Sequence, residues 1–562
     1  MENNLNFIEY QIDTKSKEAY FIHIVISFTA SVDNPTIQLS AWRPGRYMLQ
    51  NYAANVRDCK ALHSNGDELL VNKTDRNIWE IQTEQGAKIR FSYSYYCRQM
   101  DAGGCWSDPS LFYINPIACL MSVSDQSEIQ CHVKFKLPQA FTIGTGLPLY
   151  NNVYTAQSFL ELSDYPVMAS KDLTTLEYSV GDIPFYIHSL VDPSYFPESF
   201  LSDFKTFTEA QIADFGSFPV AEYHFLLLIL PYTHYHGVEH RNSTVICLGP
   251  SADVKEKLYT ELLGICSHEL LHTWNICKIR PQEMMPCNLS KENYFKTGFV
   301  AEGFTTYLGD HYLAHAHVLP LSWYESELNT LLKRHFYSFG NNHLSVADSS
   351  MDLWVDGYEA GIPGRKVSIY VKGAIIAFVM DAAIREASGN TKNIKFLLKD
   401  LWIFYTSTGK GYSEAQIEEL FHSYTNKEYL EVYSDWIYGT GDMKNDLILA
   451  LTYLGYRIDV VYHEIFLTGK AGILYDVNAI VQSVDPSSPY ATSISKGDKL
   501  VSVNGIPIKE CSEEFLQTLE ECILELNNGV RKWSLLISIT EARYFKTFQI
   551  GIPEDKARML FQ

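Results

Sequence analysis

The residues best suited to chemistry lie in ten consecutive positions, 266 to 275, which read CSHELLHTWN. In a helix, residues four apart share one face, so His268 and His272 can direct two imidazole nitrogens to one metal ion. Zinc favours neutral nitrogen ligands and, in catalytic sites, keeps one position open for water. Glu269 can take a proton from that water without becoming a ligand. The stretch therefore predicts a hydrolytic zinc site.

Two histidines at this spacing can also form an ordinary polar stripe on a helix, and the preceding segment favours the metal site. Residues 254–265 carry Leu258, Leu262 and Ile265 at helical spacing. This pattern predicts a helix with a buried face rather than a loop.

A third ligand is predicted thirty positions after His272, in the stretch GFVAEGFTTYL that begins at position 298. Val300 and Phe304 give this stretch an apolar helical stripe, and Glu302 sits beside it. A carboxylate next to core residues is costly unless it is paired or bound to metal. Glu302 is therefore the natural third ligand, and an ordinary solvated glutamate is the alternative.

The stretch YHGVEH, positions 235 to 240, follows an apolar strand-like run at 223–230. Gly237 permits close backbone approach to an extended ligand, and the carboxylate of Glu239 is free to hold a cation. An exposed glutamate in a polar loop is the commoner arrangement, so this stretch alone leaves both interpretations open.

Tyr370 opens another long apolar helix, in the stretch SIYVKGA. A tyrosine at the start of a helix can donate a hydrogen bond to negative charge that develops during a reaction. It can equally serve as a packing residue.

Length and composition set the wider frame. The chain has 562 residues, too many for one core, and its net charge of −21 argues against nucleic acid as a partner. It has no apolar run long enough to span a membrane and no secretory signal after Met1. Its eleven cysteines match no zinc ribbon. We therefore expect free thiols and a cytoplasmic protein, unless a leader has been removed.

The hydrophobic pattern changes twice along the chain, which predicts a multidomain α+β protein. Residues 1–180 show short runs of β-branched and aromatic residues, which predict an all-β sandwich that serves mainly as a platform. Residues 181–455 read as an α/β start followed by helices. Residues 456–562 return to strands, interrupted by a helix at 513–526, and predict a small β barrel with an edge open to a peptide strand.

These motifs together resemble the glycyl aminopeptidase family of gluzincin zinc metallopeptidases, over nearly the whole chain. The likeness rests on HELLHTWN followed by KIRP, then VAEGFTTYL and YVKG, and on AWRPGRYMLQNYAANV near the amino terminus. The last segment, with SPY, KGD and VNG, resembles a PDZ domain. The resemblance implies a β-sandwich domain at 1–180, a thermolysin-like catalytic domain at 181–455 and a PDZ-like domain at 456–562.

The resemblance also implies one zinc ion per chain, held by His268, His272 and Glu302. Glu269 is then the general base and acid, and Tyr370 matches the tyrosine that stabilises the tetrahedral intermediate.

Gly237 and Glu239 correspond to the loop that binds the free amino terminus of the substrate. Here the chain departs from the aminopeptidase N version of that loop. His236, Val238 and His240 stand where that version has Gly, Met and Asn.

The sequence thus predicts a zinc-dependent aminopeptidase that removes the first residue of peptides with a free amino terminus. A preference for Gly or Ala is implied by the resemblance alone. Two alternatives stay open: a zinc endopeptidase, and a non-catalytic, zinc-stabilised scaffold that binds carboxy-terminal peptides through the PDZ-like segment. The sequence predicts no oligomeric state.

Overall fold

The computed structural model describes residues 7–253, 255, 257–359, 361–426, 428–538 and 541–551. Residue 254, where we expect the zinc helix to begin, lies outside this set. The chain forms two compact units that interleave along the sequence. The first unit comprises residues 1–294, 308–319 and 398–413, and the second comprises residues 295–307, 320–397 and 414–562.

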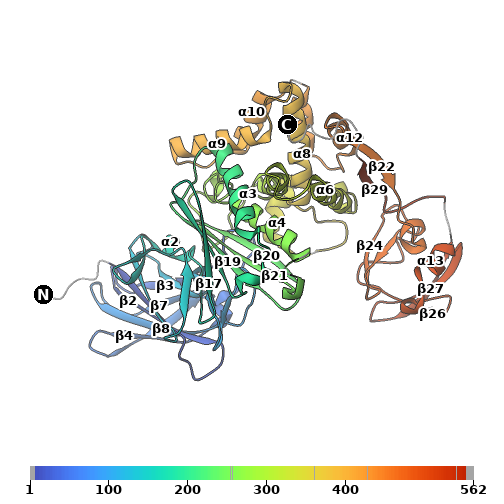
Figure 1. Cartoon of the computed structure of the whole chain (residues 1–562). Helices are drawn as coiled ribbons and strands as arrows, with labels where there is room; N and C mark the ends of the chain where they lie inside the picture. Colours follow the sequence, from blue (N-terminus) through green and yellow to red (C-terminus); the bar gives the residue numbers. More distant parts are fainter. Residues whose placement is uncertain are drawn as a thin grey trace. The chain divides into compact units, whose positions relative to one another are not determined.

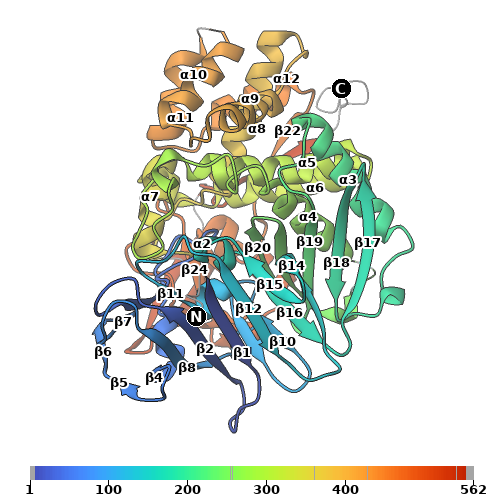
Figure 2. The ribbon, with the colours of Figure 1, turned by 90° about the vertical axis from the view of Figure 1, so that its left-hand side faces the viewer.

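The amino-terminal part of the first unit is β-rich, as predicted. Its largest sheet has eight strands in the order β14-β15-β12-β1-β2-β8-β4-β5 (Figures 1 and 2). These strands are β1 (Ile8–Asp13), β2 (Phe21–Thr29), β4 (Val56–His63), β5 (Glu68–Leu69), β8 (Lys88–Tyr96), β12 (Cys131–Lys136), β14 (Leu149–Tyr150) and β15 (Val153–Ala156).

Two four-stranded sheets complete this region, in the orders β11-β3-β7-β6 and β13-β16-β10-β9. Ile24 and Phe91 of the large sheet share one buried core with Ile37 and Ile81 of a small sheet. Sheets that bury alternate side chains against each other in this way form a sandwich-like arrangement. The small-sheet strands are β3 (Thr36–Leu39), β6 (Val71–Asp75), β7 (Ile78–Ile81), β9 (Cys105–Ser107), β10 (Phe112–Ile114), β11 (Met121–Val123), β13 (Thr142–Thr145) and β16 (Val167–Ser170).

A five-stranded sheet in the order β17-β18-β19-β21-β20 carries the candidate site. Strands β18, β19 and β21 run parallel, and β20 pairs antiparallel with β21 as an edge strand. Helices α3 and α4 pack on this sheet, α4 against β20 and β21 (Figure 1). The elements are β17 (Thr174–Val180), β18 (Ile183–Ser189), α3 (Phe200–Phe215), β19 (Tyr223–Ile229), β20 (His234–His240), β21 (Ser243–Gly249) and α4 (Lys257–Leu271).

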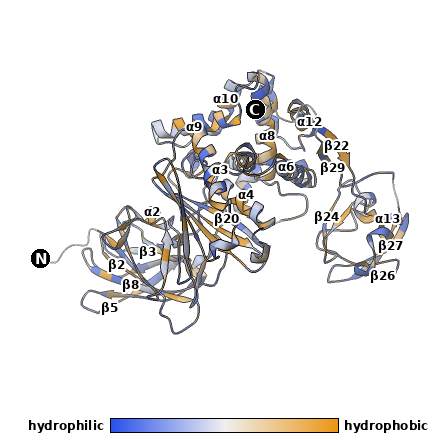
Figure 3. Cartoon of the chain, in the orientation of Figure 1, coloured by the Kyte–Doolittle hydropathy of each residue, from blue (hydrophilic) through white to orange (hydrophobic). Residues whose placement is uncertain are grey.

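The middle of the chain is mainly helical, which confirms the predicted change of pattern. In the second unit, α8 (Val371–Ser388) is buried along nearly its whole length, because its sequence is mostly apolar and its buried Asp381 pairs with Arg385. Polar and apolar stretches alternate along α9 and α10, as on surface helices (Figure 3). The remaining helices are α5 (Thr305–His315), α6 (Leu321–Phe336), α7 (Val346–Asp356), α9 (Ile394–Thr408), α10 (Glu414–Tyr424), α11 (Tyr429–Tyr438) and α12 (Lys444–Tyr453).

The last segment forms its own small β-rich core within the second unit. The predicted helix at 513–526 is confirmed only in its first part, α13 (Glu513–Thr518); the rest is wrong, because the strand β27 (Glu521–Asn527) follows. Cys522, Leu524 and Leu526 alternate inward along β27, and this two-residue period favours a strand over a helix. The other strands are β22 (Arg457–Val461), β23 (Ile473–Tyr475), β24 (Val481–Val484), β25 (Lys499–Val503), β26 (Ile506–Pro507), β28 (Lys532–Ser538) and β29 (Thr547–Gly551).

None of the helices in the described part of the chain combines the length and the apolar character that crossing a bilayer would require.

Candidate active site

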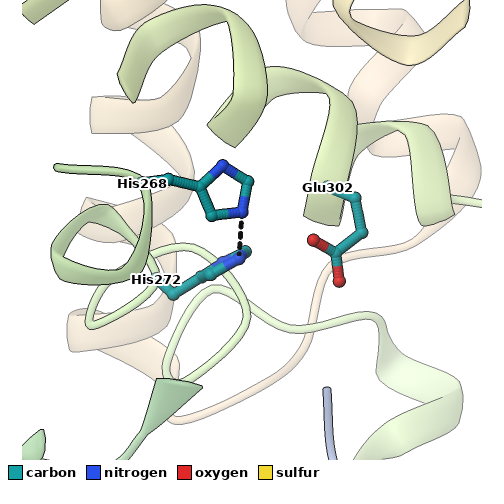
Figure 4. A group of neighbouring side chains, drawn as sticks. All are labelled: His268, His272 and Glu302. Carbon is teal, nitrogen blue, oxygen red and sulfur yellow. Dashed lines mark hydrogen bonds between the residues drawn. The ribbon is translucent and has the colours of Figure 1, made fainter. Parts of the chain in front are cut away.

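The two histidines of the motif face each other at the end of α4. His268 lies in the last turn of the helix and His272 directly after it. Their Nε2 atoms are 3.0 Å apart, and their rings are nearly perpendicular, at 85° (Figure 4). Two nitrogen ligands at about 2.0–2.1 Å from one tetrahedral zinc ion lie roughly 3.3–3.4 Å from each other. The observed separation therefore suits two ligands of a single ion.

A hydrogen bond to the backbone fixes which nitrogen of His272 can bind a metal. Nδ1 lies 2.9 Å from the carbonyl oxygen of Asn275, so the N–H on Nδ1 donates to it. This leaves the lone pair on Nε2, the atom that faces His268. The same turn holds Ile276 at φ 86°, a left-handed conformation that a β-branched residue rarely adopts. The turn accepts local strain while it holds the Asn275 carbonyl in place.

Glu302 lies on a widened helical turn, η5 (Phe299–Phe304), which continues directly into α5. Its side chain is only 2% exposed, so it is not the solvated glutamate of the alternative. Helix α5 abuts α4: Ser267 donates its hydroxyl to the carbonyl of Gly309 at 2.7 Å, and a Cβ at Gly309 would lie 3.1 Å from the Cα of His268. Gly309 is seven residues, or about two turns, beyond Glu302.

The structure brings the three predicted ligands together. One ligand atom from each of His268, His272 and Glu302 lies within 4.8 Å of the other two (Figure 4). Two imidazoles and one carboxylate are a donor set that zinc takes in hydrolases.

Glu269 points toward the edge strand β20, and Gly237 makes this possible. A Cβ at Gly237 would overlap with Oε1 of Glu269 and lie 2.8 Å from its Cδ. Any side chain at position 237 would therefore displace the carboxylate. Glu269 is 5% exposed, and its surroundings include the buried phenol of Tyr223, whose pKa is raised by burial and further by the Glu269 charge.

Glu239 is buried on the same strand, at 8% exposure, and is not part of a polar loop. Its carboxylate lies close to Glu269 and His272, because one ligand atom from each of the three falls within 4.8 Å of the others. This second group shares His272 with the first but has only one nitrogen donor. The group with two histidines suits zinc better, which leaves Glu239 and Glu269 for other roles.

A loop of the amino-terminal β-rich domain reaches Glu239. Gly45 has φ +76°, and a Cβ there would lie 2.8 Å from Oε1 of Glu239. In the same loop the guanidinium of Arg43, 3% exposed, lies against Gly103. Burial, with a further contribution from Arg43, lowers the pKa of His236 to about 4. The domain that we expected to be mainly a platform therefore contacts a predicted site residue. Gly45 lies in the AWRPGRYMLQNYAANV stretch, but the sequence does not show that this stretch meets Glu239.

Tyr370 stands at the amino-terminal end of α8, as predicted. The start of α8 packs directly on η5. The two backbones approach so closely that a Cβ at Gly303 would overlap with the backbone of Gly373. Both positions require glycine for this approach. Tyr370 therefore lies one helical turn before Gly373, which contacts Gly303, the residue after Glu302. The sequence shows both glycines but not that they meet.

Comparisons with known proteins place the chain in a peptidase family. The model of the peptidase M61 N-terminal domain matches residues 9–171, and the model of the M61 glycyl aminopeptidase matches residues 261–376. The chain is a metallopeptidase of the M61 family. The second match contains the HELLHTWN motif, Glu302 and Tyr370.

A solved structure shares the fold of this M61 chain, and others match it more weakly. An aminopeptidase N family protein from Idiomarina loihiensis has a TM-score of 0.91 at 20% identity, over 99% of this chain and 100% of that one. An M1 zinc metallopeptidase from Deinococcus radiodurans has a TM-score of 0.44 at 13% identity, over 77% of this chain and 93% of that one. No curated protein matches the chain significantly by sequence.

Proposed function

We propose that this M61 metallopeptidase is a zinc-dependent aminopeptidase that removes the first residue from peptides with a free amino terminus. One observation carries the proposal: the predicted ligands His268, His272 and Glu302 group together, and the buried carboxylates of Glu269 and Glu239 lie close to His272. A scaffold that only held zinc would have no use for two further buried acids beside it.

Zinc fits the residues present. The donors are two imidazoles and a carboxylate, and the Asn275 carbonyl presets His272 for binding through Nε2. We assign His268, His272 and Glu302 as the ligands of one ion per chain. When bound, zinc supplies a Lewis acid that polarises the scissile carbonyl and makes water more acidic.

Glu269 moves the proton in this proposal. It takes a proton from the attacking water and delivers it to the nitrogen of the leaving amine, so that one carboxylate acts as base and then as acid. Gly237 leaves room for the Glu269 carboxylate, and the close backbone of β20 restricts where that carboxylate can lie. Such positioning matters because proton transfer needs hydrogen-bond distance to the reacting group.

Glu239 holds the amino terminus of the substrate. A buried carboxylate at an edge strand can pair with an ammonium group while the peptide backbone lies along β20. This pairing fixes the cut after the first residue. The glycyl description of the matched family supports a small first residue, Gly or Ala.

Tyr370 donates its hydroxyl to the oxyanion of the tetrahedral intermediate in this proposal. Its place at the start of α8, next to the contact of Gly373 with Gly303, supports the assignment. Removal of such a donor costs about 100- to 1,000-fold in turnover. Tyr370→Phe should show this loss with little change in KM, and unchanged turnover would remove Tyr370 from the mechanism.

The test of the proposed function is a paired substrate assay on the zinc-loaded protein. We expect hydrolysis of glycyl and alanyl reporter amides and no hydrolysis of their N-acetylated forms, since acetylation removes the ammonium charge. Equal hydrolysis of both forms would show an endopeptidase. Absence of both activities in a fully zinc-loaded protein would favour the scaffold.

The carboxy-terminal segment, residues 456–562, is proposed as a PDZ-like peptide-binding domain. Strand β23 pairs only with β24 in the described part of the chain, so one edge of β23 is open to a further strand. Titration with carboxy-terminal peptides tests this, and absence of binding would leave the segment as a spacer. The borders 1–180, 181–455 and 456–562 remain our proposed domain borders.

We also propose a reducing compartment such as the cytoplasm, because all eleven cysteines are free thiols. Cell fractionation tests this, and recovery with a secreted fraction would refute it.

A further inference from the structure

A cationic hollow lies beside the strand that carries Glu239, within the first unit. Its volume is about 280 Å³, and its polar wall comes from three separate segments. Asp164 follows the short helix α2 (Phe159–Ser163), Arg241 follows β20, and Lys278 and Arg280 lie in the turn after α4. The chain as a whole carries a net charge of −21, so a wall with three cations and one acid is a local reversal of sign.

The acids near the hollow are already engaged. Arg241 pairs with Glu161 at 2.8 Å. The carboxylate of Asp164 lies 2.8 Å from Nδ1 of His240 and accepts the backbone N–H of Arg241 at 3.1 Å. Glu161 therefore pairs with Arg241, and Asp164 bonds to His240 and to the backbone of Arg241; neither carboxylate forms an ion pair with Lys278 or Arg280.

Lys278 and Arg280 form no ion pair in the part of the chain that the structure describes, and the charge of Asp164 offsets only part of the effect of burial on the pKa of Lys278. Among the residues that the structure describes, no carboxylate oxygen lies within 4.0 Å of a side-chain nitrogen of Lys278 or Arg280, which is the distance that defines an ion pair. Arg280 uses Nε to donate to the carbonyl of Ile276 at 2.9 Å. Burial lowers the pKa of Lys278, and the charge of Arg241 lowers it further. Half-buried cations beside like charges are costly unless an anion accompanies them.

We propose that this hollow binds a small molecule that carries a carboxylate group. An arginine fork and a lysine point charge are the usual pair for such a group. Leu160, Leu289 and Tyr405 also line the hollow, and these apolar side chains suit a short carbon skeleton. The volume suits a small acid or one acidic side chain.

The bound carboxylate would also act on the active site through the turn after α4. The backbone N–H of Cys277, in the wall of the hollow, donates to the carbonyl of His272 at 3.1 Å. Its thiol lies 3.6 Å from the carbonyl oxygen of His240, next to Glu239. The same turn contains Asn275, whose carbonyl fixes the His272 ring. An anion bound to Lys278 and Arg280 restricts the motion of this turn without contacting the metal ligands.

Calorimetric titration of the full chain with succinate tests the site directly. We expect binding to the protein as purified and to the same protein after chelation of its metal. Lys278→Gln and Arg280→Gln, each read separately, should weaken binding about 10- to 100-fold, while Lys278→Arg keeps it. Lys171→Gln is the matched control, because Lys171 is exposed and pairs only weakly with Asp172, at 4.0 Å.

Three outcomes overturn the proposal: no heat of binding to the wild type, equal binding by the wild type and both folded glutamine variants, or binding that disappears with the metal. Thermal unfolding of each variant shows whether it is folded, and one folded glutamine variant suffices. Because binding is measured with and without metal, it does not depend on the proposed peptidase function.

Two sources of the carboxylate are distinguished by kinetics. If the hollow takes an acidic side chain of the substrate, succinate should compete with an aspartyl reporter and leave an asparaginyl reporter unaffected. If it takes a free acid, succinate should change hydrolysis of both reporters equally. Binding of succinate without either kinetic effect would overturn the link to the active site.

Discussion

Helix α4 and the edge strand β20 supply the two halves of the proposed chemistry in different ways. On α4, His268 and Glu269 take their positions from helix geometry, and His272 from the turn that directly follows. On β20, Glu239 takes its position from pairing with β21 and from Gly45, which is almost 200 positions away in sequence. Local spacing therefore sets the two histidine ligands and Glu269, and long-range packing sets Glu239.

This difference predicts how each half fails. Changes on α4 should remove a chemical group and leave the surroundings intact. Changes around β20 should displace the carboxylates of Glu239 and Glu269. Glycine-to-alanine substitutions, which remove no functional group, should therefore still reduce activity. The substitutions below test this from the largest expected effect to the smallest.

Glu269→Gln should have the largest effect, because amide cannot take a proton from water. We expect turnover to fall by roughly 10³- to 10⁴-fold, toward the upper end of what general acid–base catalysis contributes. Steady-state kinetics with a glycyl reporter measures the loss. Zinc content should stay at the wild-type level, and normal turnover would remove Glu269 from its assigned role.

Glu239→Gln should act mainly on binding of the free amino terminus. Loss of one partner of a buried charge pair costs about 2–5 kcal/mol, so kcat/KM should fall on the order of 30- to 5,000-fold. The acetylated substrate provides the internal comparison, since its low rate should not change. An unchanged kcat/KM for the free amine would place the anchor elsewhere.

Gly237→Ala should lower turnover about 10- to 100-fold, because the added Cβ overlaps with the Glu269 carboxylate and a displacement near 1 Å is costly in an active site. Gly264→Ala is the matched control on α4, where the nearest atom to a new Cβ is 3.9 Å away. Equal activity of both variants would mean that Glu269 does not depend on close approach of β20.

Gly45→Ala should have the smallest effect, a severalfold rise in KM, because it presses on Glu239 rather than on the reacting atoms. Gly66→Ala separates this from backbone strain. Gly66 also has positive φ, +94°, but has nothing within 4 Å of a new Cβ. Both variants should lose similar stability in thermal unfolding, and only Gly45→Ala should change KM. Equal KM values for the two variants would show that the contact of Gly45 with Glu239 does not affect substrate binding.

Candidate site residues could be predicted from the sequence where they belong to one short stretch. The HELLHTWN stretch, the buried acid in VAEGFTTYL and the helix start at Tyr370 could all be read from local patterns. The strand at Glu521–Asn527 was misread as helix because a mixed apolar segment suits both periods until its partner strands are known. The contacts of Gly45 with Glu239 and of Gly303 with Gly373 depend on segments that are distant in sequence, so no local pattern reveals them.

In the proposed zinc site, Glu302 completes the ligand set of His268 and His272. The alternative group exchanges Glu302 for Glu239 and Glu269 and keeps only His272. Elemental analysis of Glu302→Ala and the matched Glu239→Ala, both purified folded, decides between them. We predict one zinc per chain in Glu239→Ala and a large loss of zinc in Glu302→Ala. Full zinc content in Glu302→Ala, with loss in Glu239→Ala, would contradict the account.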